Sequence, residues 1–264
     1  MLSWRVRRQL AAIAVVAAIG MGIALRFGAR LVPAPSCTDG RRNNHETGVD
    51  CGGGCAPCEV KSPQAPEVFW ARFARAGQDS YDAVASIQNN NQILASSEIS
   101  YLFTLFDELG AVAAKSGTAF IYPEERLYII EPGVRTTRRP VRVEFKITHI
   151  VWRLPKESEV PPRILVERRE YTVSDAAGKK QGMVQASIFN PTPFDFRTLE
   201  ANAVVFDAVG NVLGADRISL ERMASGEHRI VTFVWPEAFS SAVAKIEIYP
   251  RVNLFDPESI IKPQ

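Results

Sequence analysis

The chain has 264 residues, of which 46% are hydrophobic, and its 31 Lys and Arg residues nearly balance its 29 Asp and Glu residues. This length allows one large hydrophobic core or two ordinary ones. A formal net charge of +2 excludes the broad basic surface of a nucleic-acid-binding protein, so we expect no nucleic-acid partner. The 17 glycines and 17 prolines favour many short elements joined by turns over a few long helices.

The N-terminal segment contains an uncharged run of sixteen residues, from Leu10 to Leu25. A membrane-spanning helix requires about 20 apolar residues and tolerates about 17, so the run is short unless residues 27–32 extend it. A cleaved signal peptide is the alternative, because its apolar region is shorter. Arg26 follows the run and no clear small-x-small cleavage site lies near its end. We therefore expect residues 1–32 to form a cytoplasmic tail and an uncleaved membrane anchor.

The arginines beside this run do not settle its orientation. Three arginines precede it and four follow it within about 20 residues, and cytoplasmic flanks normally carry the excess. The raw count therefore favours a cytoplasmic location for the bulk of the chain, whereas the dense charge of the short N-terminal tail favours export. The cysteines decide between these two orientations.

All four cysteines, Cys37, Cys51, Cys55 and Cys58, lie within 22 residues. An even number of cysteines in a compact, glycine-rich stretch is typical of disulfides, which persist only in an oxidising compartment. Zinc is the alternative, but only Cys55 and Cys58 have the C-x2-C spacing of a zinc knuckle. We expect two disulfides with pairing left open, the N-terminus in the cytoplasm, and the bulk of the chain outside a cell membrane that it crosses once.

The cysteine stretch resembles a short motif of bacterial exported and surface proteins. The motif reads Cys-x-Asp-Gly, then Asn, then Glu-Thr-x-Val-Asp-Cys-Gly-Gly, then Cys-x-x-Cys, and it is matched between residues 37 and 58. The resemblance covers under a tenth of the chain. It implies an extracytoplasmic setting and no enzymatic activity.

Four residues of this stretch offer oxygen ligands of the kind that calcium prefers: Asp39, Asn43, Glu46 and Asp50. Their spacing differs from the D-x-D-x-D-G pattern of a calcium loop. Asp and Asn beside Gly are also ordinary turn residues, which is the stronger interpretation here. We therefore expect no cofactor, and calcium is the one alternative that the sequence suggests.

The remaining two hundred residues contain an internal repeat. The sequence Ala-Ser-Ile at residues 85–87 recurs 101 positions later at 186–188, and Phe-Asp at 106–107 recurs 100 positions later at 206–207. A period near 100 residues has the size of a domain rather than of a solenoid repeat. Two related domains are expected.

Each half of this region shows alternation typical of strands. In residues 141–148, Val141, Val143, Phe145 and Ile147 alternate with polar side chains, as in a strand with one buried face. Similar patterns, bounded by turn-forming residues, recur in both halves. The sequence therefore predicts an all-β fold with two tandem antiparallel immunoglobulin-like β-sandwiches, after a transmembrane helix and a small Cys-rich segment.

The expected domain boundaries follow from Pro-rich stretches. Residues 59–66 are polar and contain prolines, which is typical of a linker. Residues 151–163 contain three prolines and should separate the sandwiches, with Pro161-Pro162 stiff enough to hold a preferred relative angle. The expected parts beyond the anchor are 33–65 for the Cys-rich segment and linker, 66–155 for the first sandwich, 156–256 for the second and 257–264 for a C-terminal tail.

Residues 103–107, Phe-Thr-Leu-Phe-Asp, resemble the F-x-L-Y-D signature of bacterial immunoglobulin-like domains related to the late-embryogenesis-abundant type 14 fold. Phe106 stands in place of Tyr, and residues 203–207 are a weaker copy that keeps only Phe and Asp at its end. The resemblance covers about residues 66–256. It carries no chemistry, because the family is functionally diffuse.

The resemblance also implies structural roles for particular residues. It implies two sandwiches of the seven-stranded type. Phe103 and Leu105 would face the core of the first one, and Asp107 would cap the turn into Gly110.

Catalytic motifs are not found in the sequence. The three histidines, His45, His149 and His228, are far apart, and each is better explained as a solvated or core residue than as a catalytic one. Residues 110–116 place Lys before Ser but lack the glycine that a phosphate-binding loop requires before that Lys. We therefore expect no enzymatic activity and no catalytic residues.

Two polar loops, residues 88–92 and 190–196, follow the repeated Ala-Ser-Ile strand, so they should lie at corresponding ends of the two sandwiches. Loops at the end of a sandwich often present binding residues. Asn and Pro are also the usual constituents of turns, which is the competing explanation. The candidate binding residues are Asn89, Asn90, Asn190, Phe194 and Phe196.

The sequence as a whole favours a membrane-anchored extracytoplasmic envelope protein whose sandwiches act as a non-enzymatic binding or assembly module. It would contact the membrane through Leu10–Leu25 and bind another envelope protein or a cell-wall component. The alternatives are a structural or stress-protective envelope protein without a specific ligand, and a hydrolase with an unrecognised site. An exposed apolar patch would favour binding, a uniformly polar surface would favour protection, and a pocket with paired carboxylates or with His beside Ser would favour hydrolysis.

Overall fold

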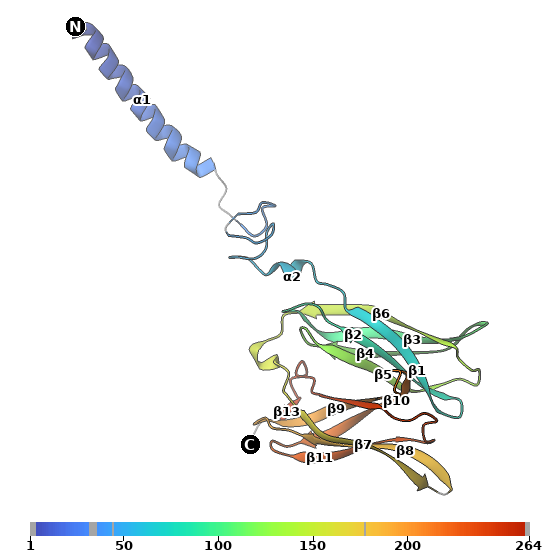
Figure 1. Ribbon diagram of the computed structural model, residues 1–264. Helices are drawn as coiled ribbons and strands as arrows, with labels where there is room; N and C mark the ends of the chain where they lie inside the picture. Colours follow the sequence, from blue (N-terminus) through green and yellow to red (C-terminus); the bar gives the residue numbers. More distant parts are fainter. Residues whose placement is uncertain (1–3, 32–35, 44, 177, 262–264) are drawn as a thin grey trace. The chain divides into compact units, whose positions relative to one another are not determined.

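The computed structural model describes residues 4–31, 36–43, 45–176 and 178–261 (Figure 1). The chain divides into two compact units, residues 1–61 and 62–264. The first unit contains one long helix and the Cys-rich segment, and the second is built almost entirely of β-strands. The predicted all-β fold with one N-terminal apolar helix is confirmed.

Helix α1 (Trp4–Leu31) contains the whole uncharged run and extends beyond it at both ends. Over Trp4–Arg26 it reaches a mean hydropathy of 1.9, and its described apolar side chains are exposed. It is long and apolar enough to cross a membrane, a criterion that an N-terminal signal sequence also meets. The helix begins before the apolar run because arginine is itself a good helix former.

The Cys-rich segment is closed by two disulfides, Cys37–Cys55 and Cys51–Cys58. A short helix, α2 (Cys58–Lys61), follows. The prediction of disulfides over zinc is confirmed, and among the three possible pairings the structure selects the interleaved one. Gly53 has a φ of +61°, and a Cβ there would collide with the carbonyl group of His45, so the tight loop between the disulfides requires glycine.

Six strands form the first sandwich, in two three-stranded antiparallel sheets with the orders β1-β2-β5 and β4-β3-β6. The alternation predicted from the sequence is seen in β6, where the side chains of the first seven residues alternate between exposed and half-buried. The strands are β1 (Glu67–Gly77), β2 (Ser80–Gln88), β3 (Ala95–Asp107), β4 (Gly110–Ile121), β5 (Arg126–Arg135) and β6 (Arg142–Arg153).

The second sandwich repeats this strand order. Its sheets are β7-β8-β11 and β10-β9-β12, so each strand from β7 to β12 corresponds to the one six places earlier in the chain, and β13 is added beside β9. The repeat seen in the sequence is thus also a repeat of topology. The elements are the 3₁₀ turn η1 (Glu157–Glu159), β7 (Leu165–Ala176), β8 (Lys179–Phe189), β9 (Asp195–Phe206), β10 (Val212–Met223), β11 (His228–Trp235), β12 (Lys245–Arg251) and β13 (Ile260–Ile261).

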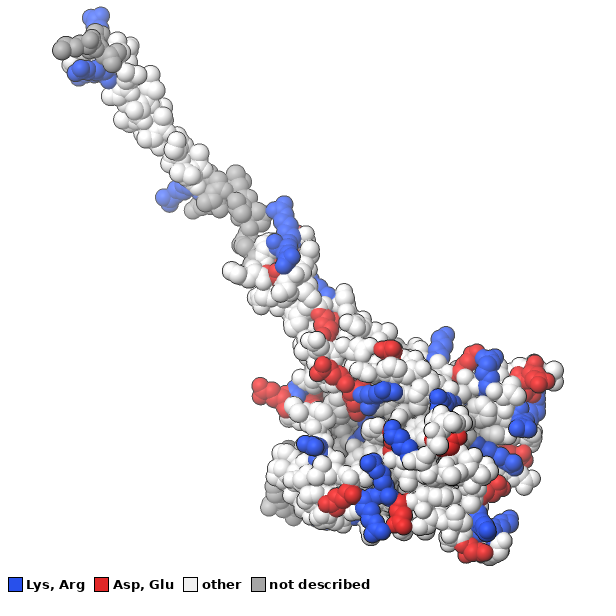
Figure 2. All heavy atoms as spheres, in the orientation of Figure 1, with Lys and Arg blue, Asp and Glu red and all other residues white. Residues whose placement is uncertain are grey.

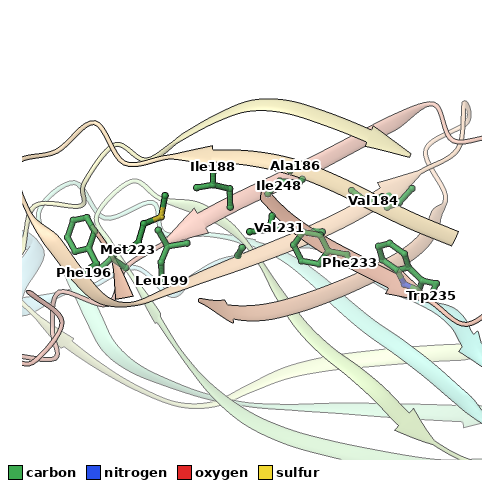
Figure 3. Packing of buried hydrophobic residues seen from close by; sticks show 14 residues of the cluster. Val184, Ala186, Ile188, Phe196, Leu199, Met223, Val231, Phe233, Trp235 and Ile248 are labelled. Atoms are coloured by element: carbon green, nitrogen blue, oxygen red, sulfur yellow. The ribbon is translucent and has the colours of Figure 1, made fainter. Parts of the chain in front are cut away.

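Each sandwich encloses its own hydrophobic core. In the first, Phe103 and Leu105 are buried as the family resemblance implied, 1% and 0% exposed. In the second, Phe196, Phe233 and Trp235 lie among aliphatic side chains between the two sheets (Figure 3). Successive side chains of a strand point to opposite faces of its sheet. One set therefore fills the core, and the other set lies on the outer face.

A third hydrophobic cluster joins the two sandwiches. It packs the outer face of β1-β2-β5 against the outer face of β10-β9-β12, with Val84 and Ile130 on one side and Val204 and Phe206 on the other. Trp70 contacts this cluster and lies with its ring centroid 5.5 Å from that of Tyr128. The two sandwiches therefore form one body with four stacked sheets.

The two central strands of this stack are buried on both faces. In β2, Ala83 and Ala85 point into the first core whereas Val84 points into the shared cluster. In β9, Ala203 and Val204 are divided in the same way between the second core and the shared cluster. Small side chains suit these strands because two layers pack against each of them.

The two outermost faces of the stack are more polar at corresponding positions. Gln185, 101 positions after Val84, is exposed on β8, and Thr104, 100 positions before Val204, is half-buried on β3. Unlike sheets meet in the stack, so further copies would otherwise be able to add at either end. The same outer faces also carry exposed apolar side chains, among them Ile230 and Val234 on β11, so polarity at two positions does not by itself prevent such addition.

Several expectations on boundaries require correction. The described part of the first sandwich has six strands rather than seven. Residues 257–264 are not simply a tail, because β13 pairs with β9 and Ile260 packs against the second core. The expected linker 59–66 is shorter, because Asn91 binds the backbone of Gln64 through two hydrogen bonds of 2.8 Å. Strand β13 could not be recognised in the sequence, because its two residues are too few to show alternation.

The repeated Phe-Asp sequence marks the same turn in both sandwiches. Asp107 Oδ1 accepts hydrogen bonds from the backbone nitrogens of Leu109 (2.8 Å) and Gly110 (3.0 Å), as the resemblance implied. Asp207 Oδ1 accepts corresponding bonds from Val209 (3.0 Å) and Asn211 (2.8 Å). These contacts explain the conserved spacing within the repeat as turn chemistry.

Candidate binding site between the two sandwiches

Asn89, a predicted binding residue, is fully buried where β2 leads into its loop. Its Nδ2 donates to the carbonyl oxygens of Leu94 (2.7 Å) and Tyr122 (2.8 Å). Its Oδ1 accepts from the backbone nitrogen (3.0 Å) and Nδ2 (2.8 Å) of Asn91. The amide is thus saturated within the protein and ties two loops together, which leaves nothing for a ligand.

Asn190 occupies the corresponding position in the second sandwich and is also fully buried. Its Nδ2 donates to the carbonyl oxygens of Phe194 (2.8 Å) and Ala224 (3.0 Å), and its Oδ1 accepts from the backbone and hydroxyl of Thr192. The two loops do lie at corresponding ends of the sandwiches, as predicted. Both asparagines are structural, however, so the interpretation as turn residues applies to them.

The other predicted loop residues differ in exposure. Phe196 is 1% exposed and belongs to the second core, so it is unable to contact a partner. Phe194 is 49% exposed, and Asn90 is exposed with its Nδ2 bonded to Glu67 Oε2 at 3.1 Å. The difference between the phenylalanines follows from position, because Phe196 begins the inward alternation of β9 and Phe194 precedes it.

The residues suggested for calcium are engaged in hydrogen bonds of the Cys-rich loop. Asp50 accepts from the Gly40 nitrogen at 3.0 and 3.1 Å, and Glu46 accepts from the Asp50 nitrogen at 3.0 Å. Asp39 accepts from Asn43 Nδ2 at 2.7 Å, a bond that lowers the pKa of the Asp39 carboxyl.

Their geometry does not form a calcium cage. Among the described residues, the group of ligand-type atoms within 4.8 Å joins Glu46 with Cys37 and Cys55, whose sulfurs are bonded to each other. The three carboxylates of the predicted site form no such group. Calcium takes six to eight oxygen ligands, and its binding at these residues stays a prediction of the sequence.

One cluster combines the residue types of a hydrolase. On the outer face of the second sandwich, Glu167 Oε2 lies 2.9 Å from His228 Nδ1 and accepts a 3.2 Å hydrogen bond from the Ser187 hydroxyl. In a catalytic triad the histidine lies between the serine and the acid, so that it can accept the serine proton. Here the carboxylate is in the middle, and both contacts are exposed on the strand surface.

A polar groove of about 600 Å³ lies along the junction of the two sandwiches. Strands β3 and β4 form one wall, and β9, β10 and the segment after β12 form the other. Hydroxyl groups predominate in its lining. The residues concerned are Ser97, Thr118, Thr198, Ser219 and Ser259, with the carboxylates Glu98, Glu200 and Asp256.

A cavity of about 50 Å³ continues the groove inward. The two spaces share Thr118, Glu200 and Arg251 in their lining, and the inner one adds Asn202 and Arg217 from β9 and β10. The inner cavity thus lies between the shared hydrophobic cluster and the open groove. It is large enough for water or for one small polar group.

Asn202 is the least satisfied polar residue of this cavity. It is 2% exposed, and its Nδ2 donates to Glu200 Oε1 at 2.9 Å. Its Oδ1 has no hydrogen-bond partner within the part of the chain that the structure describes. A buried acceptor without a donor costs about 1–3 kcal/mol, so its retention calls for an explanation.

Arg251 closes the groove at its floor and is itself fully engaged. Its Nε and Nη2 donate to the Glu125 carboxylate at 2.9 and 3.0 Å, and Nη2 also donates to the Phe120 carbonyl at 2.8 Å. The guanidinium lies 4.0 Å from the centroid of the Phe120 ring. This residue of the second sandwich is thereby fixed to the first.

The alternation of β9 contained a signal for this site. Its even-numbered residues change from polar Thr198, Glu200 and Asn202 to apolar Val204 and Phe206 along one face. The apolar half of this face is buried, and exposure increases along its polar half from buried Asn202 through half-buried Glu200 to exposed Thr198, so the polar half marks where packing is incomplete. The sequence did not reveal which element covers that face.

Comparisons with known proteins do not assign this site. No family model and no curated protein match the chain. Among solved structures, red sea bream transglutaminase matches with 12% identity and a TM-score of 0.24 over 72% of this chain, which spans 29% of that protein. The tandem CBM22-1-CBM22-2 domains of Paenibacillus barcinonensis Xyn10C match with 9% identity and a TM-score of 0.15, over 72% of this chain and 86% of theirs. At such scores neither likeness supports an argument about function.

Proposed function

We propose that the chain is a membrane-anchored extracytoplasmic protein whose two sandwiches act together as a non-enzymatic binding or assembly module. The proposal is based on the packing of two non-equivalent sheets, one from each sandwich. This packing fixes two domains into one scaffold and leaves a polar groove of about 600 Å³ along their junction. Ligand sites occur preferentially at such domain interfaces.

The described side chains of the groove suit binding through hydrogen bonds and lack the His-beside-Ser arrangement of a hydrolase. The carboxylates Glu98, Glu200 and Asp256 also line the groove, so hydrolysis by paired carboxylates is the competing interpretation. Arg251 is engaged by Glu125, and His228 lies on the outer face of the second sandwich, away from the lining. Within the described lining there is no histidine to activate one of the hydroxyls. Recognition through hydrogen bonds requires no such activation.

The location rests on two features of the first unit. Helix α1 has the length and composition of a membrane span, and the next segment carries two disulfides. Disulfides persist in oxidising compartments, so the Cys-rich segment belongs outside the cytoplasm. In this topology Met1–Gln9 form the cytoplasmic tail. The groove then lies outside the membrane, where its partner is an envelope protein or a cell-wall component. We also propose that the two sandwiches belong to the immunoglobulin-like domains related to the late-embryogenesis-abundant type 14 fold.

A test of location uses fusions at the C-terminus of the full chain. Alkaline phosphatase, which requires disulfides, should be active there, and a reporter that folds only in the cytoplasm should be inactive. The reverse pattern would contradict the proposed topology. A chain released into the medium would show that α1 is a cleaved signal sequence.

A test of binding uses a photo-crosslinking residue placed in intact cells. At Ser219, in the groove, it should capture a discrete partner, whereas at Thr232, on the outer face of β11, it should not. Equal capture at both positions, or at neither, would argue against the groove as the binding surface.

A structural or protective role without a specific ligand is the second candidate. It is favoured by the charge pattern, because Lys and Arg alternate with Asp and Glu across the visible face of the strand-rich unit (Figure 2). The most exposed apolar residues, Leu109 and Val209, are isolated at corresponding hairpin tips, 89% and 83% exposed. Such single residues form no apolar docking patch.

A further inference from the structure

One buried hydrogen-bond acceptor in the inner cavity is unsatisfied among the described residues. Asn202 Oδ1 is buried and lacks a partner among the described residues, whereas its Nδ2 is held by Glu200. This hydrogen bond fixes the orientation of the amide, because Glu200 is an acceptor and selects the nitrogen. The oxygen therefore remains available to whatever enters the cavity.

The charges of the lining select the class of ligand. The carboxylates Glu98, Glu200 and Asp256 disfavour an anion, and Arg217 disfavours a cation in the inner cavity, where Arg251 is already paired with Glu125. A neutral ligand avoids both repulsions. It also has to satisfy acceptors and donors together, because the lining offers carboxylate and amide oxygens beside hydroxyl and guanidinium donors.

Hydroxyl groups meet this requirement, since each one donates once and accepts twice. We propose that the groove binds a neutral polyhydroxylated ligand, a sugar or the end of a sugar chain, with one ligand hydroxyl inserted into the inner cavity. This proposal rests on the proposed binding function and assigns a ligand class to it. The inserted hydroxyl donates to Asn202 Oδ1 and lies near Glu200 and Thr118.

The size of the two spaces agrees with this arrangement. About 50 Å³ accommodates a hydroxymethyl-sized group, and about 600 Å³ accommodates one or a few sugar rings. A space of this size and polarity suits a water molecule, which can bridge polar groups at little cost. Binding then exchanges this water for a ligand hydroxyl that reproduces its hydrogen bonds.

The experiment uses the full chain in detergent micelles and saturation-transfer NMR with four probes. Glucose is the neutral monosaccharide, and glucosamine and glucuronate are its cationic and anionic counterparts. Maltotriose distinguishes a chain from a free sugar. We expect transfer to a neutral probe at a Kd of about 1 mM or tighter, and at least about tenfold weaker binding of both charged probes. A stronger signal from maltotriose would identify a chain as the source, and a stronger signal from glucose would identify the free sugar.

Two variants link the signal to the cavity. Asn202→Leu fills the site with a side chain of similar size and removes the acceptor, so binding should weaken by about tenfold or more. Glu200→Gln keeps the shape and removes the charge, and it should weaken binding to a smaller extent. Thr232→Val is the matched control, because Thr232 lies outside both spaces and should leave binding unchanged.

The outcomes separate this proposal from the general function. A cooperative thermal transition for each variant verifies that it folds, and Glu200→Gln remains informative where Asn202→Leu does not fold. The proposal is overturned if no neutral probe binds, if a charged probe binds more tightly, or if Asn202→Leu and Glu200→Gln both leave binding unchanged. In any of these cases, a partner captured by crosslinking at Ser219 would still support the binding function with a ligand of another class.

Discussion

The indole Nε1 of Trp235 donates a 3.3 Å hydrogen bond to Oδ2 of Asp82, so a core residue of the second sandwich is held by a buried carboxylate of the first. Asp82 is 4% exposed, and its other oxygen accepts from the Gly133 nitrogen at 3.1 Å. Gly214 leaves room for the indole, because a Cβ there would lie 2.6 Å from Trp235 Nε1. The contact lies beside the shared hydrophobic cluster.

This buried carboxylate should make stability depend on pH. Burial, reinforced by the nearby charge of Asp216, raises the pKa of Asp82 to about 6. The unfolded chain has a value of about 3.9, so between these values the folded state binds more protons than the unfolded state. The free energy of unfolding should therefore fall as the pH rises from about 4 to about 6, by about 2–3 kcal/mol from this group.

Urea unfolding at a series of pH values checks this prediction. Asp82→Asn should flatten the dependence between about pH 4 and 6, because the residue no longer titrates. Glu237→Gln, an exposed carboxylate near Trp235 in sequence, is the control and should keep the wild-type profile. An unchanged slope in Asp82→Asn would show that another group controls this range.

Replacing Arg251 should loosen the junction of the sandwiches. Its guanidinium is 7% exposed and forms two bonds to Glu125 and one to the Phe120 carbonyl. Arg251→Met leaves the carboxylate and carbonyl without their donor, at a cost of about 3 kcal/mol measured by denaturant unfolding. Arg197→Met is the comparison, because the Arg197–Glu258 pair is largely exposed and its loss should cost less than about 1 kcal/mol. Equal losses would mean that Arg251 does not couple the two sandwiches.

The asparagines of the two repeated loops should matter equally for stability. Asn89→Ala leaves two buried carbonyl groups without donors, and Asn190→Ala leaves two partly buried ones, so each should lower the free energy of unfolding by about 2–3 kcal/mol. Asn90→Ala, at an exposed neighbour, should change it by less than about 0.5 kcal/mol. If Asn90→Ala were as harmful, the loop rather than its buried amide would be responsible.

The two phenylalanines after Asn190 should respond in opposite ways. Phe196→Ala opens a hole in the second core and should cost about 3–5 kcal/mol. Phe194→Ala, at a half-exposed side chain, should have a small effect on thermal unfolding. A loss of partner capture in Phe194→Ala without a loss of stability would restore this residue as a binding contact.

The disulfide pairing can be read from free thiols. Cys51→Ser should release one thiol, at Cys58, and preserve the Cys37–Cys55 bond in non-reducing peptide mapping. The thermal transition of residues 62–264 should remain unchanged, because the Cys-rich segment belongs to the other compact unit. Release of a thiol at Cys55 or at Cys37 instead would indicate one of the two other pairings.

Calcium remains a prediction of the sequence, and the same preparation tests it. Removing calcium with a chelator should leave the thermal transition unchanged if the carboxylates serve only the backbone amides that they contact. A shift that increases with calcium concentration would show a site that forms from another arrangement of these residues.

Local patterns in the sequence were sufficient for the elements of this protein. The uncharged run predicted α1, the crowding of Cys37 to Cys58 predicted disulfides, and the alternation around Phe145 predicted strands. These signals are local because a helix, a small crosslinked loop and a strand each have a characteristic period or spacing. The repeat of 100 residues also predicted that one topology would occur twice.

The domain boundaries and the roles of the loop residues were harder to predict from the sequence. Asn89 and Asn90 are neighbours in sequence, and one is fully buried whereas the other is exposed. Asn is equally suited to a buried turn and to an exposed binding loop. The outcome depends on the carbonyl groups of Leu94 and Tyr122, and Tyr122 is supplied by a distant part of the chain.

The sequence by itself determined which residues form strands, which cysteines are close enough to crosslink, and that the strand-rich part of the chain consists of two copies of one domain. Only the tertiary structure decided that unlike sheets of the copies meet, and that Asn202, Glu200 and Arg251 therefore line one groove. The physical reason is that alternation specifies two faces of a strand without naming what covers them. Contacts between Val84 and Val204, or between Asp82 and Trp235, depend on docking across more than a hundred residues of chain.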